Sequence, residues 1–563
     1  PEWSVVRAWV DARVANARFD KRVFVEVDVP YDDGSRMRTL YTAWHRGALG
    51  GHERWGTDEI ELYVDGGPDA AHIDGAVGAR LRLQHDLDGD GRDEMVVTPW
   101  FTLWGEGDYA PRADDPWAPG LDSPLNPAEA PAADSVRFAP FEDPGQVVLT
   151  EIDRVIETQR ADPSGRHTVH AAIFNLSDPA IVEKLVEAHD AGVELRLITD
   201  AKKLRPWSDW LRGDDRLLRA GVPLLGVRRP GLGAMHDKIG LFDGRAVTTG
   251  SMNWEHGARF ENHENLLHSE DPALVAAFAR RFEALAGGPL VAHGGRLDEA
   301  TWVGFGPDQA PHVEAGHLID AATERVDVVM FTAKDFRYDG ESLFAKLAAA
   351  AARGVEVSLI TDAGVSEGLE YFGVVGEDDQ TDEWLEARGV HVVRADNAFG
   401  QYASMHHKFL LVDDALVGTG ALNWYFDAAF VNDEDFVVRR DPALVERFRA
   451  ERVDLLRRYD PDFDAAEHPE GTLEIAATHQ GTQFGETLVL VGDLPELGAW
   501  DPAAGVALDP TDWPRWRARV TLPAGVRFRW KLVTRGPDGD RWEQGDDRLT
   551  QMPRDGELEV RWR

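Results

Sequence analysis

The chain has 563 residues, a hydrophobic fraction of 43% and no cysteine. This length exceeds what one hydrophobic core organises, so we expect three or four domains. The absence of cysteine excludes disulfides, thiolate metal sites and thiol nucleophiles. No apolar run approaches the roughly 18 residues that would suggest a membrane-spanning helix.

The net charge of −40 bears on the partners, since 100 acidic residues stand against 60 basic ones. Proteins that hold long nucleic acids usually present a basic surface, because phosphate contacts supply most of the affinity. The acidity therefore disfavours nucleic acid as a partner, although a nuclease with a locally positive cleft stays open. The simpler alternative is that an acidic surface keeps the protein soluble.

Residues 1–110 predict a β-rich domain, which we expect to be a β-sandwich. In residues 22–29 every second residue is Val, which predicts a strand with one apolar face. Residues 14–25, with an Asn, a Phe and a Lys ahead of this strand, are similar to the family 21 starch-binding sandwich. That resemblance implies carbohydrate binding, and an unrelated β-domain is the alternative.

The acidic segment 86–94 has the ligand spacing of a calcium loop. Carboxylates occupy positions 1, 3, 5 and 9 of the segment, with Gly at position 6. The candidate metal-binding residues are Asp86, Asp88, Asp90, Arg92 and Glu94. Because Val97 stands where an EF-hand has Glu, we expect a β-hairpin loop with a structural calcium. A solvated acidic turn is the alternative.

A linker rich in Pro, Ala, Gly and Asp follows at 111–135, and residues 136–460 then alternate strand-like and helix-like segments. This alternation is typical of α/β folds. The segment 191–201 recurs as 353–363, each copy being a helix that ends in Gly before a buried strand. The repeat predicts two copies of one α/β half, at 136–295 and 296–460.

Each half contains the same polar residue types at an offset of 170. The first half supplies His236, Lys238, Asp243, Asn253 and Glu264, and the second supplies His406, Lys408, Asp413, Asn423 and Glu434. Residues two apart in a strand point to the same face, so the His and Lys of each motif can reach one ligand. Lysine is scarce, and two of the nine lysines occupy these equivalent positions.

Two such halves facing each other would place two His, two Lys and two Asn around one phosphate. One His can attack phosphorus as a covalent nucleophile, while the other protonates the leaving oxygen and then activates water. The Glu of each motif can orient a His through its second ring nitrogen. Lys and Asn donors stabilise charge on the transferring group, so we expect no metal or other cofactor in catalysis.

The paired motifs resemble the HxKxxxxD signature of the phospholipase D superfamily, with its following GSxN and Glu, over about 320 residues. The resemblance implies a pseudo-twofold α/β core and a phosphohistidine intermediate. It implies that His236 and His406 are the nucleophile and the acid–base pair. The implied phosphate-binding residues are Lys238, Lys408, Asn253 and Asn423, the His-orienting residues are Glu264 and Glu434, and the mainly structural ones are Asp243 and Asp413.

One position departs from this signature, because Ala421 replaces the expected Ser. We expect reduced rather than abolished activity, since Thr419 is close by. The favoured reaction is hydrolysis of a phospholipid headgroup, with a nuclease and a hydrolase of glycan-linked phosphodiesters as alternatives. A glycan-binding protein with a decayed catalytic core is a further alternative. Intact His, Lys, Asn and Glu in both halves argue against decay.

Residues 471–563, after a short polar stretch, predict an all-β sandwich rich in aromatics. The strings LGAWDP at 497–502 and WEQG at 542–545 resemble the family 20 carbohydrate-binding module, the starch-binding domain. A flat indole matches the apolar face of a glucose ring, and two indoles at an angle match a helical α-glucan.

This second resemblance implies that Trp500 and Trp542 form the stacking platform, with Lys531 and Glu543 as polar contacts. Asp547 stands where the family usually has Asn, which removes the amide of that contact. The residues expected at a second sugar site are Phe484 and Trp513. The alternative is that Trp500 belongs to the core, although Trp516 and Trp530 are the better core candidates.

The sequence therefore predicts a multidomain α/β plus all-β protein. A pseudo-twofold phospholipase D-like core is flanked by an N-terminal β-sandwich and a C-terminal starch-binding β-sandwich. The expected partners are a phosphodiester, with phospholipid favoured, and α-glucan or starch. A cysteine-free chain with a glycan-binding module favours an extracellular or cell-surface location, with the cytoplasm as the alternative.

Overall fold

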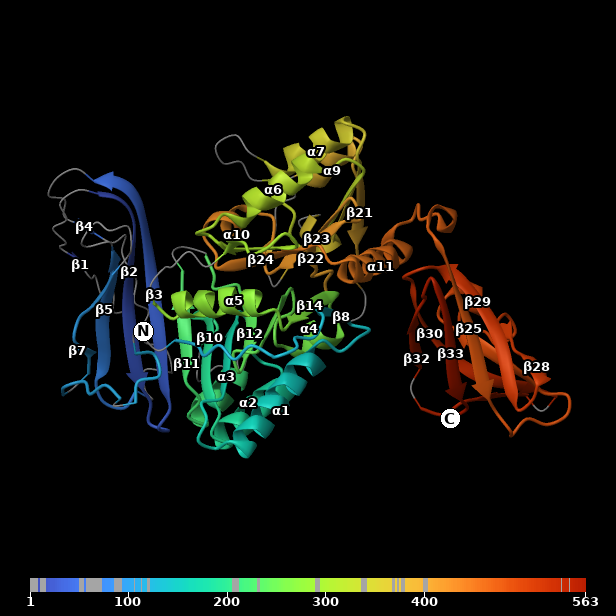
Figure 1. Ribbon diagram of the computed structural model, residues 1–563, viewed down its shortest axis with the longest axis horizontal. Helices are drawn as coiled ribbons and strands as arrows, with labels where there is room; N and C mark the ends of the chain where they lie inside the picture. The colour runs from blue at the N-terminus through green and yellow to red at the C-terminus, as the bar shows by residue number, and fades with distance from the viewer. Residues whose placement is uncertain are drawn as a thin grey trace. The chain divides into compact units, whose positions relative to one another are not determined.

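The computed structural model divides the chain into two compact units (Figure 1). The first comprises Pro1–His391 and Asp396–Asp441, and the second comprises Val392–Ala395 and Pro442–Arg563. The residues that the structure describes are 9–10, 17–49, 55–56, 73–85, 94–105, 107–112, 114–118, 122–204, 212–229, 233–288, 294–335, 342–366, 370–371, 374–375, 380–397, 403–537, 539–545 and 547–563.

One large mixed sheet organises the first part of the first unit. Its strand order is β6-β5-β2-β3-β11-β10-β9-β12-β13-β14-β8, with β7 paired to β5. The strands are β2 (Ala17–Pro30), β3 (Arg36–Leu49), β5 (Val77–His85), β6 (Glu94–Val97), β7 (Phe101–Trp104), β8 (Ser135–Ala139), β9 (Thr168–Ile173), β10 (Glu194–Asp200), β11 (Leu224–Arg228), β12 (Lys238–Phe242), β13 (Ala246–Gly250) and β14 (Glu264–Ser269).

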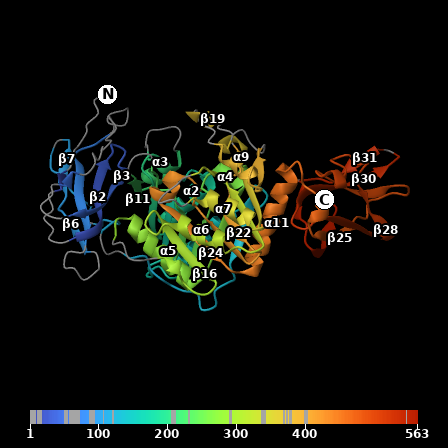
Figure 2. The same cartoon turned by 90° about the horizontal axis from the view of Figure 1, so that it is seen from above.

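The N-terminal strands extend the sheet of the first α/β half, so the expected separate β-sandwich is not confirmed. Strand β3 pairs in parallel with β11, and β2 pairs with the other edge of β3 (Figure 2). The Val face of β2 is buried as expected, with Val25 and Val27 at 2% and 3% exposure. The opposite face is buried as well, because Glu26 binds the guanidinium groups of Arg80 and Arg82.

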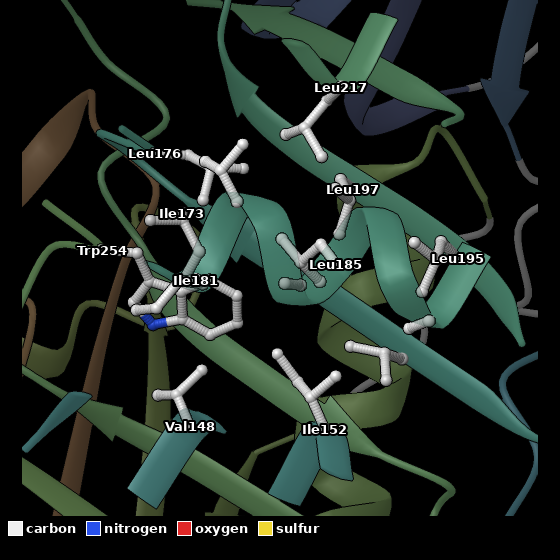
Figure 3. Close-up of a cluster of buried hydrophobic side chains, with 14 of the residues drawn as sticks. Val148, Ile152, Ile173, Leu176, Ile181, Leu185, Leu195, Leu197, Leu217 and Trp254 are labelled. Carbon is white, nitrogen blue, oxygen red and sulfur yellow. The ribbon is translucent and has the colours of Figure 1, made fainter. Parts of the chain in front are cut away.

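Helices cover this sheet where apolar residues recur at helical spacing. They are α1 (Gly145–Ala161), α2 (Pro179–Asp190), α3 (Arg212–Arg219), α4 (His256–Phe260) and α5 (Pro272–Leu285). Helix α2 begins at Pro179 because the Asp178 carboxylate caps the amide of Ile181. Leu185 of α2 and Ile152 of α1 pack in the core around Leu197 of β10 (Figure 3).

A second sheet repeats the first half. Its order β24-β23-β22-β17-β18 matches β14-β13-β12-β9-β10 of the first sheet, as the sequence repeat predicts. The strands are β15 (Gly295–Arg296), β16 (Thr301–Gly306), β17 (Arg325–Met330), β18 (Glu356–Asp362), β22 (Lys408–Val412), β23 (Leu416–Gly420) and β24 (Glu434–Arg439). The helices are α6 (Pro311–Ala321), α7 (Leu343–Ala352), α8 (Ala363–Ser366), α9 (Thr381–Glu386) and α10 (Phe426–Phe430). Helix α5 packs on β12 and β13 of the first sheet and on β16 of the second.

The second unit contains helix α11 (Pro442–Tyr459) and the all-β sandwich that the sequence predicts. One sheet has the order β28-β29-β25-β33, and the other has β27-β26-β30-β31 with β32 on β30. The main strands are β25 (Glu470–Thr478), β26 (Thr487–Gly492), β29 (Arg515–Pro523), β30 (Arg527–Gly536) and β33 (Asp555–Arg561). The short strands are β27 (Val506–Ala507), β28 (Asp509–Asp512), β31 (Gly539–Trp542) and β32 (Arg548–Gln551). Trp516 and Trp530 are core residues, at 3% and 0% exposure. Within the described residues, no helix is both long and apolar enough to cross a membrane.

Candidate active site

The two His motifs meet where the halves of the first unit exchange backbone hydrogen bonds. The amide of His236 donates to the carbonyl of Asp433 (2.9 Å), and the amide of His406 donates to the carbonyl of His263 (3.0 Å). Short parallel bridges join Met235 to Asp433 and His263 to Met405. Each His motif is therefore fixed against the segment that carries the Glu of the other half.

The side chains continue this exchange. Nδ1 of His236 lies 2.8 Å from Oε2 of Glu434, and Nδ1 of His406 lies 2.7 Å from Oε1 of Glu264. Each pair shares one proton on the Nδ1 side of the ring, which leaves Nε2 available for chemistry. Both imidazole side chains are 11% exposed, so the site is buried but reachable.

The two lysines occupy equivalent places behind the imidazoles. Nζ of Lys238 donates to the carbonyl of His236, and Nζ of Lys408 donates to that of His406, both at 2.7 Å. Phenylalanines at the ends of the repeated strands pack on the same rings. Phe174 lies 5.0 Å from His236 and Phe331 lies 4.5 Å from His406, measured between ring centroids.

The two motif asparagines are oriented by different partners. Nδ2 of Asn253 donates to Oε1 of Glu255 at 3.3 Å. Oδ1 of Asn423 instead accepts from the amide of Thr332 at 3.3 Å. In both cases the amide group is held in one orientation, with donor hydrogens left for an anionic oxygen.

Buried polar side chains cross between the halves around this centre. Nδ2 of Asn265 donates to the Thr419 hydroxyl (2.6 Å), and the Thr249 hydroxyl donates to Asp435 (2.5 Å). These two contacts are related by the offset of 170. A fully buried Arg281 also binds both Asp237 and Asp433. Such buried ion pairs favour one arrangement of the two halves.

Burial and charge shift the pKa values of the cluster in opposite directions. Burial, with the charges of Lys238 and Lys408, lowers the pKa of His236 and His406 well below 6.5. Burial raises the pKa of Glu264 to about 7 and that of Glu434 well above its ordinary value. It lowers the pKa of Lys408 to about 7. A bound anion would favour the charged lysines, so the cluster is suited to a phosphate group.

Asp243 and Asp413 lie in tight turns after β12 and β22, where their φ angles are 54° and 52°. Asp413 accepts backbone hydrogen bonds from Thr323, Glu324 and Arg325, the last at 2.9 Å. Asp243 contacts the His167 ring at 3.0 Å. Both aspartates fix the start of the preceding repeat strand, and neither contacts the His pair.

The position of Ala421 makes the halves unequal. The Ser251 hydroxyl accepts from the amide of Asn265 at 2.9 Å and helps to lower the pKa of Glu264. Ala421 cannot do either for the second half. The Thr419 hydroxyl binds Asn265 and the carbonyl of Lys408, so it does not replace the missing hydroxyl.

The expected sugar-binding residues lie on the surface of the second unit, with one difference. The Trp500 and Trp542 rings lie 6.4 Å apart at 41°, and Trp542 is 38% exposed. Phe484 and Trp513 are also exposed. Lys531 donates to the Gly545 carbonyl at 2.7 Å and lies 3.6 Å from Asp547.

Glu543 differs from its expected role as a sugar contact. Its side chain is buried, and its carboxylate accepts from the amide of Leu532 (3.0 Å) and from Nε of Arg548 (2.9 Å). In this conformation the carboxylate is closed to a sugar and stabilises the strands beneath the platform.

Two groups of residues have the chemistry of metal ligands. Asp86, Asp88, Asp90 and Arg92 lie outside the described residues, and Glu94 is the first residue of β6, so the calcium loop stays a prediction. Among described residues of the first unit, Glu151, His268 and Glu270 have ligand atoms within 4.8 Å of one another. Arg245 forms ion pairs with both carboxylates, so its guanidinium already supplies the positive charge that a metal ion would bring.

Sequence reasoning missed Phe174, Phe331, Glu255 and the Arg281 network. The two Phe residues carried a signal, because each ends a repeated apolar strand. Glu255 carried a weaker signal, because the equivalent position 170 residues later holds Tyr425 and the two halves therefore differ there.

Comparison with known proteins agrees with this geometry. Residues 163–286 and 316–453 match the family described as "Cardiolipin synthase, PLD-like domain", and residues 472–561 match "Starch binding domain". The mitochondrial cardiolipin hydrolase of Chlamydomonas reinhardtii is 31% identical over 123 residues, which cover 22% of this chain and 52% of that protein. An α-amylase of Streptomyces violaceus is 37% identical over 78 residues, 14% of either chain. The chain thus spans about half of the first relative and a small part of the second.

Two solved structures are also similar. Phosphatidylserine synthase of Haemophilus influenzae is 14% identical, with 59% of this chain and 90% of that chain covered and a TM-score of 0.43. The phospholipase D family member Nuc of Salmonella typhimurium is 21% identical, with 29% and 97% covered and a TM-score of 0.24. From the matched families and the paired motifs, residues 163–286 and 316–453 belong to the phospholipase D superfamily, and the chain joins them to a C-terminal starch-binding domain.

Proposed function

We propose that the protein hydrolyses the phosphodiester of a phospholipid headgroup through a covalent phosphohistidine, while its C-terminal domain binds α-glucan. The observation that carries the catalytic proposal is the reciprocal pairing of the two imidazoles. His236 and His406 each bind a Glu of the other half through Nδ1, so both present Nε2 to one buried site.

The reaction has two steps. In the first, Nε2 of one neutral His attacks phosphorus, and the bond from phosphorus to the alcohol oxygen breaks. The second His, protonated on both ring nitrogens when the anionic phosphate is bound, gives its Nε2 proton to that oxygen. In the second, the second His takes a proton from water, whose oxygen attacks phosphorus and releases the first His. The products are the free alcohol and a phosphate monoester.

The phosphate oxygens carry the charge that the site must stabilise throughout. Lys238 and Lys408, with the amides of Asn253 and Asn423, supply donors from both sides of the site. Preorganised donors of this kind stabilise a transferring phosphoryl group without reorganisation. We therefore propose that catalysis needs no metal. A structural calcium at residues 86–94 would be independent of the reaction.

Two observations favour a phospholipid over nucleic acid. The relatives of the catalytic core are named as cardiolipin hydrolases, and cardiolipin is a phospholipid. The net charge of −40 opposes the binding of a long polyanion. The starch-binding domain supports α-glucan as a second partner and an extracellular or cell-surface location for the protein.

The test compares turnover of phosphatidylcholine, cardiolipin and single-stranded DNA side by side, each with and without EDTA. We expect phospholipid turnover that persists in EDTA and is absent from His236→Ala and His406→Ala. Faster turnover of DNA would make the protein a nuclease. Loss of all turnover in EDTA, with the circular dichroism spectrum unchanged, would indicate a metal mechanism.

A further inference from the structure

The two halves of the active site differ in the side chains beside the shared motif. Glu255 follows Asn253 by two positions, and Tyr425 stands at the equivalent place after Asn423. Lys203 and Val365 form a second unequal pair. Each lies three positions after an aspartate, Asp200 or Asp362, that accepts from the backbone amide preceding the catalytic His. The first half therefore carries two ionisable groups where the second has an uncharged phenol and an alkyl group.

Glu255 lies directly against the phosphate-binding machinery. Oε1 accepts from Nδ2 of Asn253 at 3.3 Å, and Oε2 accepts from Nδ2 of Asn175. The other amide atom of Asn253, Oδ1, is buried and has no hydrogen-bond partner among the described residues. Glu255 is thus the group that orients this amide, and the charges of Lys203 and Lys238 act on its carboxylate.

A cation lies on the same side. Nζ of Lys203 is 4.8 Å from the centroid of Phe174, whose ring packs on His236. The charge of Lys203 helps to lower the pKa of His236 and also that of Glu255, so it acts on both groups. Phe174, Asn175, Lys203 and Glu255 are all half-buried, so each keeps part of its surface accessible.

We propose that Glu255, Asn175 and Lys203 form a subsite for a hydroxylated alcohol, such as glycerol or a sugar, that is esterified to the reacting phosphate. The subsite rests on the proposed function, because it places the alcohol next to a phosphate held by both His motifs. A carboxylate accepts from hydroxyls, an ammonium donates to them, and an amide does both. Hydroxyl groups on adjacent carbons satisfy all three.

Other alcohols fit this set less well. A trimethylammonium group has no N–H or O–H to donate, so it leaves the Asn175 and Lys203 donors without a hydroxyl oxygen. A purely apolar alcohol would strip water from Glu255 and Lys203 without replacing their hydrogen bonds, which is unfavourable. Burial raises the pKa of Glu255 to about 7, and even the protonated carboxyl can donate to and accept from a hydroxyl.

The test uses two soluble diesters that differ only in hydroxyl groups, p-nitrophenyl glyceryl phosphate and p-nitrophenyl propyl phosphate. Nitrophenolate is a good leaving group, so both diesters report on the site whatever the natural lipid is. The measured quantity is the ratio of kcat/KM for the glyceryl ester to that for the propyl ester. We expect wild type to favour the glyceryl ester by at least about tenfold, which is the size of one charge-assisted hydrogen bond.

Glu255→Gln keeps an acceptor for Asn253 and changes the group that faces the alcohol. It should lower the ratio about tenfold, as should Lys203→Met independently. Tyr425→Phe is the matched control, because it alters the equivalent position of the second half, and it should keep the wild-type ratio. A ratio near one in wild type, or one that Glu255→Gln and Lys203→Met leave unchanged, overturns the subsite. Cleavage of neither diester by wild type contradicts the proposed function itself.

Discussion

The imidazole of His236 is oriented by Glu434, which lies 198 positions later in the chain and in the other half of the core. His406 and Glu264 form the reciprocal pair, 142 positions apart. Neither half contains a complete His–Glu pair of its own. The active site therefore exists only when the two halves are packed together, and each half depends on the other for the orientation of its catalytic ring.

The first prediction concerns the two histidines. His236→Ala or His406→Ala alone should remove nearly all turnover, because each ring is one partner of a single catalytic unit. The measurement is kcat on the preferred phosphodiester, with the fold checked by circular dichroism. A single variant that kept about a tenth of wild-type turnover would contradict a shared site.

The second prediction separates orientation from chemistry. In Glu434→Gln the amide can donate to Nδ1 of His236, which would move the ring proton to Nε2 and block its role as nucleophile or base. We expect kcat to fall by about 10² or more, within the range of a positioned acid–base group. The ring tautomer of His236 should change in its nitrogen NMR spectrum, while that of His406 should not.

Glu187→Gln is the control for this experiment, since Glu187 is an exposed residue of α2 that pairs with Lys184. It should leave both kcat and the His spectra unchanged. Equal spectral changes at both histidines in Glu434→Gln would argue against the crossed pairing and for a general loss of structure.

The catalytic residues could be predicted from the sequence because they repeat. Residue types held at one offset point to a duplicated site, and the structure brings His236, His406 and their lysines together. The crossing of the Glu partners could not be predicted in this way. A repeat gives the members of each half, but by residue type either Glu could pair with either His. Only the packing of the two halves decides which pairs form.

The N-terminal region was predicted less well for a different reason. The Val repeat in β2 predicts one buried face, which the structure confirms for Val25 and Val27. It carries no information on the edge of the sheet, where β3 pairs with β11 of the catalytic half. The linker likewise contains no periodic pattern, yet the carbonyl of Trp117 accepts a hydrogen bond from Arg82 at 2.7 Å.

The third prediction follows from the pKa of Lys408, which burial lowers from 10.5 to about 7. As pH rises through about 7 this side chain loses its charge, so the affinity for an anion should fall. Sulfate, whose charge is constant in this range, should inhibit wild type more weakly at pH 9 than at pH 7. In Lys408→Arg the guanidinium stays charged over this range. The affinity of the variant for sulfate should therefore fall less steeply with pH than that of wild type, by about a factor of ten per pH unit.

The comparison of slopes removes the contribution of Glu264, whose pKa is also about 7 and which is present in both proteins. The inhibition constant of sulfate is measured at several pH values for wild type and for Lys408→Arg. Parallel curves would mean that Lys408 does not titrate in this range. A steeper curve for the variant would mean that Lys408 does not bind the anion.

The last prediction concerns the starch-binding domain, where the argument rests on stacking rather than charge. Trp500 and Trp542 lie at an angle suited to a helical α-glucan, with ring centroids 6.4 Å apart. Trp500→Ala should weaken binding of β-cyclodextrin about tenfold, because a ring at full burial is worth roughly 1.5–3 kcal/mol. Isothermal titration calorimetry measures the loss, and phosphodiesterase turnover should be unchanged because the histidines lie in the other unit.

Trp500 also packs against Val489, Val491 and Val533, so its removal could disturb the domain as well as the platform. Trp542→Ala is the second variant, because Trp542 is 38% exposed and lies outside that cluster. If both variants stay folded and lose affinity together, the two rings form one platform. If Trp500→Ala unfolds the domain while Trp542→Ala binds normally, Trp500 is a core residue and the platform is wrong. A wild-type protein that binds no α-glucan would contradict the proposed role of the domain and leave the phosphodiesterase proposal intact.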